Sequence, residues 1–159
     1  MAGTRRRDRH GRGLRGALLP PRAKVGAAHV LVPGFRTRAD RFDDLVRLAF
    51  EELEARWPDE LGDVELAVEE VPPPAAVEQA RQGVAVEGLV ADDTPGGAVP
   101  LGRLRRATAD APARVVVYRR PVEVRGDDRQ DLAALVREVV VDLVAELLGI
   151  DPEDVDPGP

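Results

Sequence analysis

Residues 128–149 read DRQDLAALVREVVVDLVAELLG, and this stretch decides the fold because it is the strongest helical pattern in the chain. Its large apolar residues recur at steps of three and four, which places them on one face of a helix. Asp127 or Asp128 can cap the first turn, and Gly149 permits the turn that ends many helices. We therefore predict a long amphipathic helix that begins after Gly126 and ends at Gly149. Its apolar face consists of Leu132, Leu135, Val136, Val139, Val140, Leu143 and Leu147.

Strand patterns lie upstream of this helix. Residues 114–118, Arg-Val-Val-Val-Tyr, are almost continuously β-branched or aromatic, which is typical of a central strand covered on both faces. Residues 64–69 alternate between apolar and mostly charged side chains, as in a strand with one buried face. A weaker strand is expected at 84–90, followed by an exposed loop at 92–97. Residues 101–110 carry no clear period, and we expect them to be irregular.

A second helix is predicted near the start of the folded part. Apolar residues from Phe42 to Trp57 again recur at three- and four-residue steps. Thr37 or Asp40 can cap this helix, and Pro58 ends it, which gives a range of about 39–57. Together with the strands, this pattern predicts an α/β (α+β) fold in which a small mixed sheet of three to four strands packs against two main helices.

Composition bounds the class of protein. The chain has 159 residues, 43% of them hydrophobic but only 3% aromatic, so we expect one domain with an aliphatic core. It has no cysteine, which excludes disulfides and cysteine-ligated metals and favours a cytoplasmic location. Neither a signal-peptide core nor a run of roughly 20 apolar residues is present, so we expect no membrane association.

Charge is distributed unevenly along the chain. Residues 1–41 hold eleven basic and two acidic side chains, net +9, which leaves −15 for the remainder of a chain whose total is −6. We therefore divide the chain into a basic disordered arm at 1–36, a folded domain at 37–150 and an acidic tail at 151–159 that frays. The arm is a solvated tail in the simplest interpretation, and a nucleic-acid contact in the alternative one. Both histidines, His10 and His29, lie in it, so neither is expected to act as a catalytic base or ligand.

Two carboxylates in the last helix suggest a polar pocket. Asp142 and Glu146 are four residues apart and share a face. On a helical wheel Glu146 falls inside the apolar stripe, where an unpaired carboxylate would be costly to bury. We expect one or both to pair with an arginine, with Arg119 or Arg120 as the candidates.

The order of elements and several segments are similar to the minimal zincin-like metallopeptidase family, a small bacterial family. The most specific similarity lies in residues 112–123 (PARVVVYRRPVE), in 136–141 (VREVVV) and in the following Gly149-Ile150. The segments 9–16 and 18–21 also resemble actinobacterial members. The similarity covers most of residues 40–152.

This resemblance implies a zinc site that the chain does not carry. The family motif is His-Glu-x-x-His-x-x-Gly-x-x-Asp, in which the histidines bind zinc and the glutamate is the general base. Aligned on the glycine, these positions hold Asp142, Leu143, Glu146 and Pro152. We therefore expect no zinc and no other cofactor. Asp142 and Glu146, with Asp151 beside Pro152, leave open a weak site for a hard cation such as Mg²⁺ or Ca²⁺.

Three functions follow from these patterns. The favoured one is a catalytically inactive pseudoenzyme that serves as a binding or scaffold module for a protein or peptide partner, with the peptide beside the edge strand. The second is a metal-dependent hydrolase that uses the carboxylates of the changed motif. The third is a nucleic-acid-associated protein that acts through the basic arm.

Overall fold

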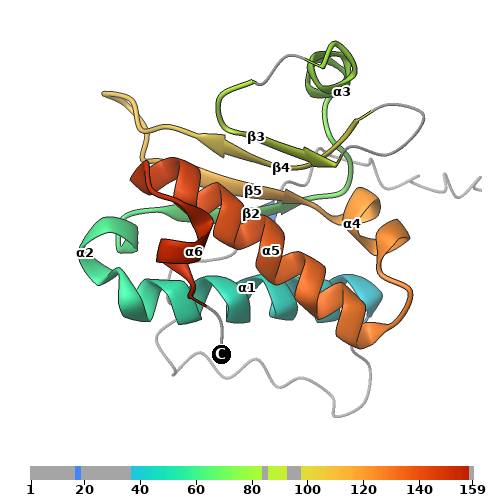
Figure 1. Ribbon diagram of the computed structural model, residues 1–159, viewed down its shortest axis with the longest axis horizontal. Coiled ribbons are helices and arrows are strands. Elements are labelled where there is room, and N and C mark those ends of the chain that lie inside the picture. Colours follow the sequence, from blue (N-terminus) through green and yellow to red (C-terminus); the bar gives the residue numbers. More distant parts are fainter. Residues whose placement is uncertain (1–16, 19–36, 84–85, 93–97, 158–159) are drawn as a thin grey trace, which may run out of the picture.

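The computed structural model describes residues 17–18, 37–83, 86–92 and 98–157. A five-stranded sheet of order β1-β2-β5-β4-β3 forms its centre (Figure 1). The strands are β1 (Ala17–Leu18), β2 (Glu65–Glu69), β3 (Leu89–Asp92), β4 (Val99–Arg105) and β5 (Arg114–Tyr118). β2 and β5 run parallel, whereas the other neighbouring pairs are antiparallel. The expected mixed sheet is therefore confirmed, as four strands extended by the two-residue β1.

Two long helices cover the sheet. α1 (Arg38–Arg56) contacts α5 (Arg129–Leu148), and α5 also contacts β3, β4 and β5 (Figure 1). Thr37 caps α1 through a reciprocal pair of hydrogen bonds with Asp40, and the Asp128 carboxylate caps α5. At the other end of α5, Gly149 adopts a left-handed conformation with φ of 69°, as the sequence predicted.

Four short helices complete the described part of the domain. They are α2 (Pro58–Leu61), α3 (Pro74–Arg81), α4 (Arg119–Arg125) and α6 (Pro152–Val155). α3 packs against β4 and β3, and α6 packs against α5. No helix in the described part of the chain has both the length and the apolar character that crossing a bilayer requires.

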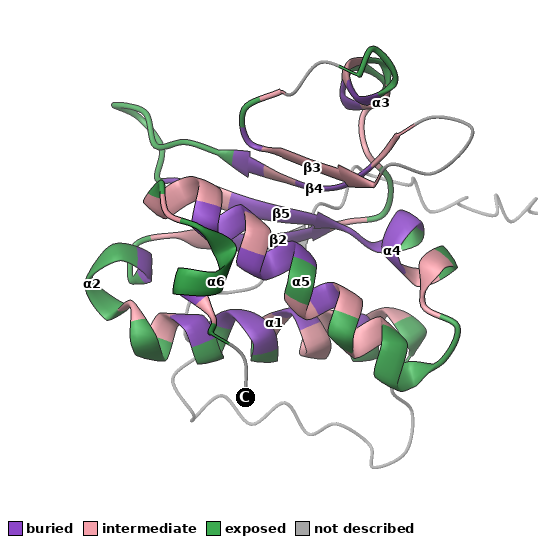
Figure 2. Ribbon diagram, in the orientation of Figure 1, coloured by how far each residue is buried: buried purple, intermediate pink, exposed green. Residues whose placement is uncertain are grey.

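The core is mostly aliphatic, with Phe42 and Phe50 of α1 among its members, and it lies mainly between the sheet and the two long helices (Figure 2). β5 is buried on both faces, because Val115 and Val117 join the main core while Val116 and Tyr118 join a smaller cluster with Ala67. The continuously apolar pattern of this strand is thereby explained.

Gly102 of β4 allows α5 to lie close to the sheet. A Cβ atom at this position would stand 2.7 Å from Leu143 Cδ1 and 2.9 Å from the Val116 carbonyl oxygen. The absence of a side chain therefore sets how near the C-terminal half of α5 lies to β4, and this half carries the candidate site.

The sequence-based boundaries were correct for the strongest elements and wrong for the weaker ones. The strand predicted at 84–90 is corrected to Leu89–Asp92, and residues 84–85 of that prediction lie outside the described part. The prediction that 101–110 is irregular is wrong for its first half, because β4 occupies Val99–Arg105. Pro100 and Gly102 interrupt the apolar pattern of β4, but pairing with strands on both sides stabilises it.

Both ends of the chain also differ from expectation. Within the arm at 1–36, Ala17–Leu18 form β1, and the other residues lie outside the described part. The expected fraying of residues 151–159 is wrong for 151–157, because α6 buries Val155 and the Asp156 carboxylate accepts hydrogen bonds from Arg56 and Arg137. Residues 158–159 lie outside the described part. One apolar side chain and one set of ion pairs hold this segment on the domain.

Candidate functional site

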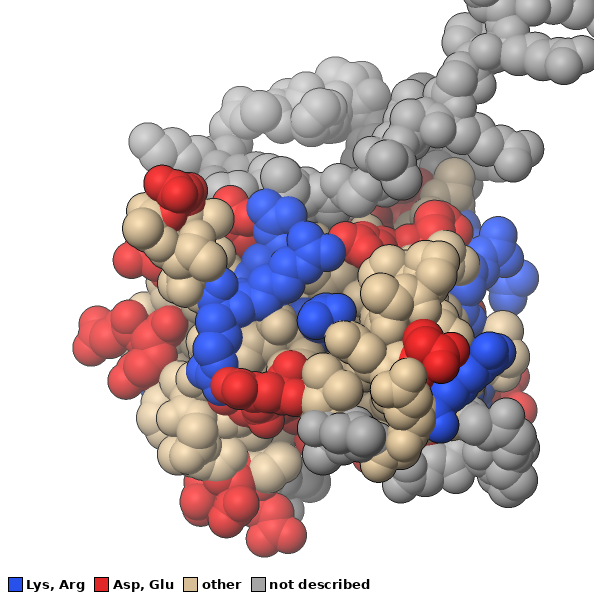
Figure 3. Space-filling model, turned by 90° about the horizontal axis from the view of Figure 1, so that it is seen from above, with Lys and Arg blue, Asp and Glu red and all other residues tan. Residues whose placement is uncertain are grey.

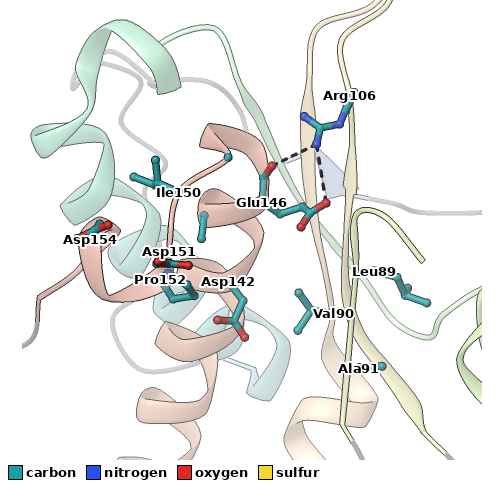
Figure 4. A pocket seen from close by; sticks show the side chains of 12 residues that line it. Leu89, Val90, Ala91, Arg106, Asp142, Glu146, Ile150, Asp151, Pro152 and Asp154 are labelled. Atoms are coloured by element: carbon teal, nitrogen blue, oxygen red, sulfur yellow. Dashed lines mark hydrogen bonds and ion pairs between the residues drawn. The ribbon is translucent and has the colours of Figure 1, made fainter. Parts of the chain in front are cut away.

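An open groove of about 760 Å³ lies between the C-terminal half of α5 and the edge strand β3 (Figure 4). β3 contributes residues 89–91, and the turn after α5 contributes residues 149–152. The side chains that line the groove from α5 are Asp142, Ala145 and Glu146. The groove therefore contains the two carboxylates that the sequence singled out.

Glu146 connects α5 to the turn before β3. Its Oε1 atom accepts a hydrogen bond of 3.2 Å from the backbone N–H of Gly88, and it lies 3.8 Å from a guanidinium nitrogen of Arg106. Arg106 also donates to the Glu146 carbonyl oxygen at 3.3 Å (Figure 4). A second donor of the same guanidinium bonds to the Glu87 carboxylate at 2.8 Å. Glu146 pairs with Arg106 and not with Arg119 or Arg120, and 39% of its side chain is exposed, so it lies at the rim of the core and not inside it.

Asp142 lies one turn earlier on α5 and is half-buried. Burial raises the pKa of its carboxyl, and the negative charge of Glu138 raises it further. Among the described residues no arginine or other cation pairs with this carboxylate. Figure 4 shows Asp142 between Val90 of β3 and Pro152 of α6, so its carboxylate is a polar group of the groove wall.

Leu143 belongs to the core and not to the groove. It is fully buried between α5 and the sheet, where its Cδ1 atom fills the space above Gly102. The position that holds the general base in the zinc motif is therefore occupied by a packed aliphatic side chain that can neither accept a proton nor reach the groove.

The turn after α5 brings further carboxylates to the groove. Pro152 is the first residue of α6 and supplies no side-chain ligand, whereas Asp151 and Asp154 line the groove beside it. α6 is held in place by the Trp57 indole, which donates to the Val155 carbonyl oxygen at 3.4 Å. The wall of the groove is thus fixed to α1 as well as to α5.

The two arginines that the sequence suggested as partners lie elsewhere. Arg119 is buried at the start of α4 and pairs with Glu70 and Glu123, and Arg120 also pairs with Glu70. Burial acts to lower the pKa of Arg119, but its hydrogen bond with Glu70 and the charge of Glu123 raise it above the ordinary value. The expected polar pocket of Asp142, Glu146, Arg119 and Arg120 is corrected accordingly: Arg106 takes the place of both arginines.

Arg106 and Gly88 are the residues that sequence reasoning missed. Nothing in the sequence placed Arg106 near α5, because residues 101–110 were expected to be irregular and β4 was not predicted. Recognising β4 would have placed Arg106 one residue beyond its end, next to the turn before β3. Gly88 has φ of 75°, and an isolated glycine before a strand was the only signal of this turn.

On the face seen in Figure 3, several basic side chains lie side by side, with acidic side chains around them. Near β4 and β5, Arg105 pairs with Glu69, Arg106 with Glu87 and Arg114 with Glu65. Each of these three arginines is therefore matched by a neighbouring carboxylate.

The side chains of the groove do not fit a zinc site. α5 carries no histidine, Glu146 is bound to Gly88 and Arg106, and Leu143 is buried in the core. Within the ranges that the structure describes, no group of three or more His, Cys, Asp or Glu side chains is placed to hold a metal ion. A cation site built from Asp142, Glu146 and Asp151 therefore lacks the converging oxygens that Mg²⁺ or Ca²⁺ requires.

Comparison with known proteins agrees with the resemblance noted in the sequence. The family model described as "Zincin-like metallopeptidase" matches residues 61–158, which is more than half of the chain. The match begins just before β2 and extends through β5, α5 and α6, so it includes every element that lines the groove. No curated protein matches the chain.

Proposed function

The chain belongs to the zincin-like metallopeptidase family, and from this premise we propose that it binds an extended polypeptide segment in the groove without hydrolysing it. The observation that carries this proposal is the pairing of Glu146 with Arg106 and Gly88 in the groove itself. At the place where the family motif has its second metal-binding histidine, an ion pair stabilises the wall of the groove.

The changed motif positions support loss of hydrolysis. Peptide hydrolysis by the family mechanism requires a group that takes a proton from the attacking water. Leu143 stands at that position and is fully buried against β4. Asp142 and Glu146 do not supply the missing zinc ligands, because two carboxylates on one helix turn, one of them bound to arginine, provide too few free donors.

The edge strand supports binding of an extended segment. β3 pairs with β4 on one side, and the described part of the chain places no strand on its other side. Residues 89–91 of this strand line the groove opposite α5. An extended peptide can therefore form main-chain hydrogen bonds with β3 while its alternate side chains enter the groove.

Amide chemical-shift mapping tests this proposal. The full ¹⁵N-labelled chain is titrated with a heptapeptide of alternating threonine and valine that carries citrulline at its centre, which favours an extended conformation and has no charged side chain. We expect shift changes at residues 88–92 and 142–152, and no cleavage of the peptide. Changes confined to α1 or α2, or release of peptide fragments, would contradict the proposal.

A pair of tryptophan variants provides the control. Ala91→Trp adds a large side chain at a residue that lines the groove. This variant should bind the peptide at least about tenfold more weakly, because the added ring occupies the space of the ligand. Leu48→Trp adds the same ring at an exposed position of α1 and should leave the affinity unchanged. Equal affinities of the two variants would show that the peptide does not occupy the groove.

A further inference from the structure

We propose that the groove selects its extended segment through a basic side chain, best an arginine, that pairs with Asp142. This inference rests on the proposed function and specifies the chemistry of the partner. It is carried by the position of Asp142 opposite the edge strand and by the excess of negative charge around it.

The charged groups of the groove are unbalanced. Asp142, Glu146, Asp151 and Asp154 line it, and Arg106 is the one basic side chain among the described residues that does so. The guanidinium of Arg106 is already bound to Glu146 and Glu87. Among the residues that the structure describes, none forms an ion pair with Asp142, Asp151 or Asp154. The groove is thus complementary to a cation and repels an acidic side chain.

Asp142 is the group in this set that would gain most from a cation. It is half-buried, and burial opposes its negative charge, as the raised pKa of this carboxyl indicates. A partly desolvated carboxylate without a partner costs folding free energy, and an arginine bound to it recovers part of this cost through charge-assisted hydrogen bonds.

The geometry places such a cation correctly. Asp142 faces Val90 across the groove, so a strand paired with β3 would direct every second side chain toward α5 (Figure 4). The groove also adjoins the C-terminal end of α5, which reaches Leu148, and unpaired carbonyl groups make that end of a helix partially negative. Both features favour a positive side chain at the same place.

The test compares three labelled heptapeptides that differ only at the central residue. The flanking residues alternate threonine and valine, and the centre is arginine, citrulline or glutamate. Citrulline has nearly the shape of arginine but no charge, so it isolates the ion pair. With the full chain, fluorescence anisotropy should give about tenfold tighter binding for the arginine peptide than for the citrulline peptide, and the weakest binding for the glutamate peptide.

Two variants assign the effect to one carboxylate. Asp142→Asn should remove the preference for arginine, so that this variant binds the arginine and citrulline peptides with equal affinity. Asp110→Asn removes the same charge from an exposed loop residue outside the groove and should retain the preference for arginine. Circular dichroism of both variants checks that they are folded.

The possible failures are distinguishable. Equal binding of the arginine and citrulline peptides, or a preference that survives Asp142→Asn, overturns this inference and leaves the proposed function in place. If none of the three peptides binds, the proposed function fails, and the inference fails with it.

Discussion

The carboxylate of Glu146 lies 3.8 Å from the guanidinium of Arg106, although the two residues belong to different elements and are 40 positions apart. The same carboxylate accepts the N–H of Gly88. Through these two contacts one side chain of α5 connects the end of β4 to the turn that leads into β3. The ion pair and the hydrogen bond therefore attach α5 to the two segments that flank β3 and β4 at this end of the groove.

Removing the Glu146 carboxylate should loosen the edge strand. We expect Glu146→Ala to lower the free energy of unfolding by about 1 kcal/mol, because it removes a backbone hydrogen bond and a half-exposed ion pair. Hydrogen exchange at residues 86–92 should become faster, while exchange in β5 stays unchanged. Glu51→Ala, at an exposed position of α1, is the matched control. Equal exchange rates at 86–92 in the two variants would contradict this role of Glu146.

The C-terminal segment should be released by acid. Hydrogen bonds from Arg137, and then from Arg56, hold the pKa of Asp156 below its ordinary value, while burial acts in the opposite direction. Its contribution to stability is therefore complete above the pKa of the unfolded chain, near 3.8, and is lost as the pH falls through the lower folded value. Asp156→Asn should lower the free energy of unfolding by about 1–2 kcal/mol at pH 7.

Urea unfolding of the wild type and of Asp156→Asn at several pH values measures this effect. The difference between the two proteins should shrink below about pH 4, where the Asp156 carboxyl of the unfolded chain begins to be protonated before that of the folded protein. The Asp156 side chain is only 7% exposed, so loss of its charge should also expose Val155 and the wall of the groove. A difference that is independent of pH would show that the ion pairs do not hold α6.

Asp142 should show the opposite dependence on pH. Burial and the charge of Glu138 raise the pKa of this carboxyl, so the folded protein binds its proton more tightly than the unfolded chain does. Stability is thus lost as the pH rises from the ordinary value of 3.8 through the raised folded value. Asp142→Asn should stabilise the protein at pH 7, by no more than about 1 kcal/mol because the half-exposed charge is screened by water.

The stabilisation by Asp142→Asn should disappear at low pH, because the Asp142 carboxyl of the wild type is then neutral as well. Thermal unfolding of Asp142→Asn and wild type at pH 7 and pH 3 measures both limits. If the variant is less stable than the wild type at pH 7, the Asp142 carboxylate has a stabilising partner, and the argument for a missing cation in the groove does not hold.

The sequence alone was sufficient to predict the helices and the strand whose own residues carry all the usual signals. Both long helices have a cap, an apolar stripe and an end residue within their own sequence, and β5 has an unbroken β-branched run. β4 has none of these, because Pro100 and Gly102 interrupt it and its stability comes from two neighbouring strands. α4 was missed for a similar reason, since Pro121 obscures a short helix that the core holds through Val122.

The sequence predicted the residues that α5 contributes to the groove but not those from the opposite wall. Spacing on α5 identified Asp142 and Glu146, and both line the groove. The helical-wheel projection predicted that Glu146 is more buried than it is. The buried face of α5 also includes Val141, Val144 and Ala145 and is therefore broader than the apolar stripe used for the prediction. The partner arginine depended on where β4 ends, a tertiary property that single-sequence periodicity does not contain.

Zinc content measured together with proteolytic activity tests the central claim most directly. The full chain is saturated with zinc and dialysed, then assayed for bound metal and for cleavage of an unfolded protein substrate. With Leu143 in the core and Glu146 bound to Arg106, we predict only a small fraction of one zinc ion per chain and no cleavage. One zinc ion per chain, together with cleavage that a chelator abolishes, would contradict the account.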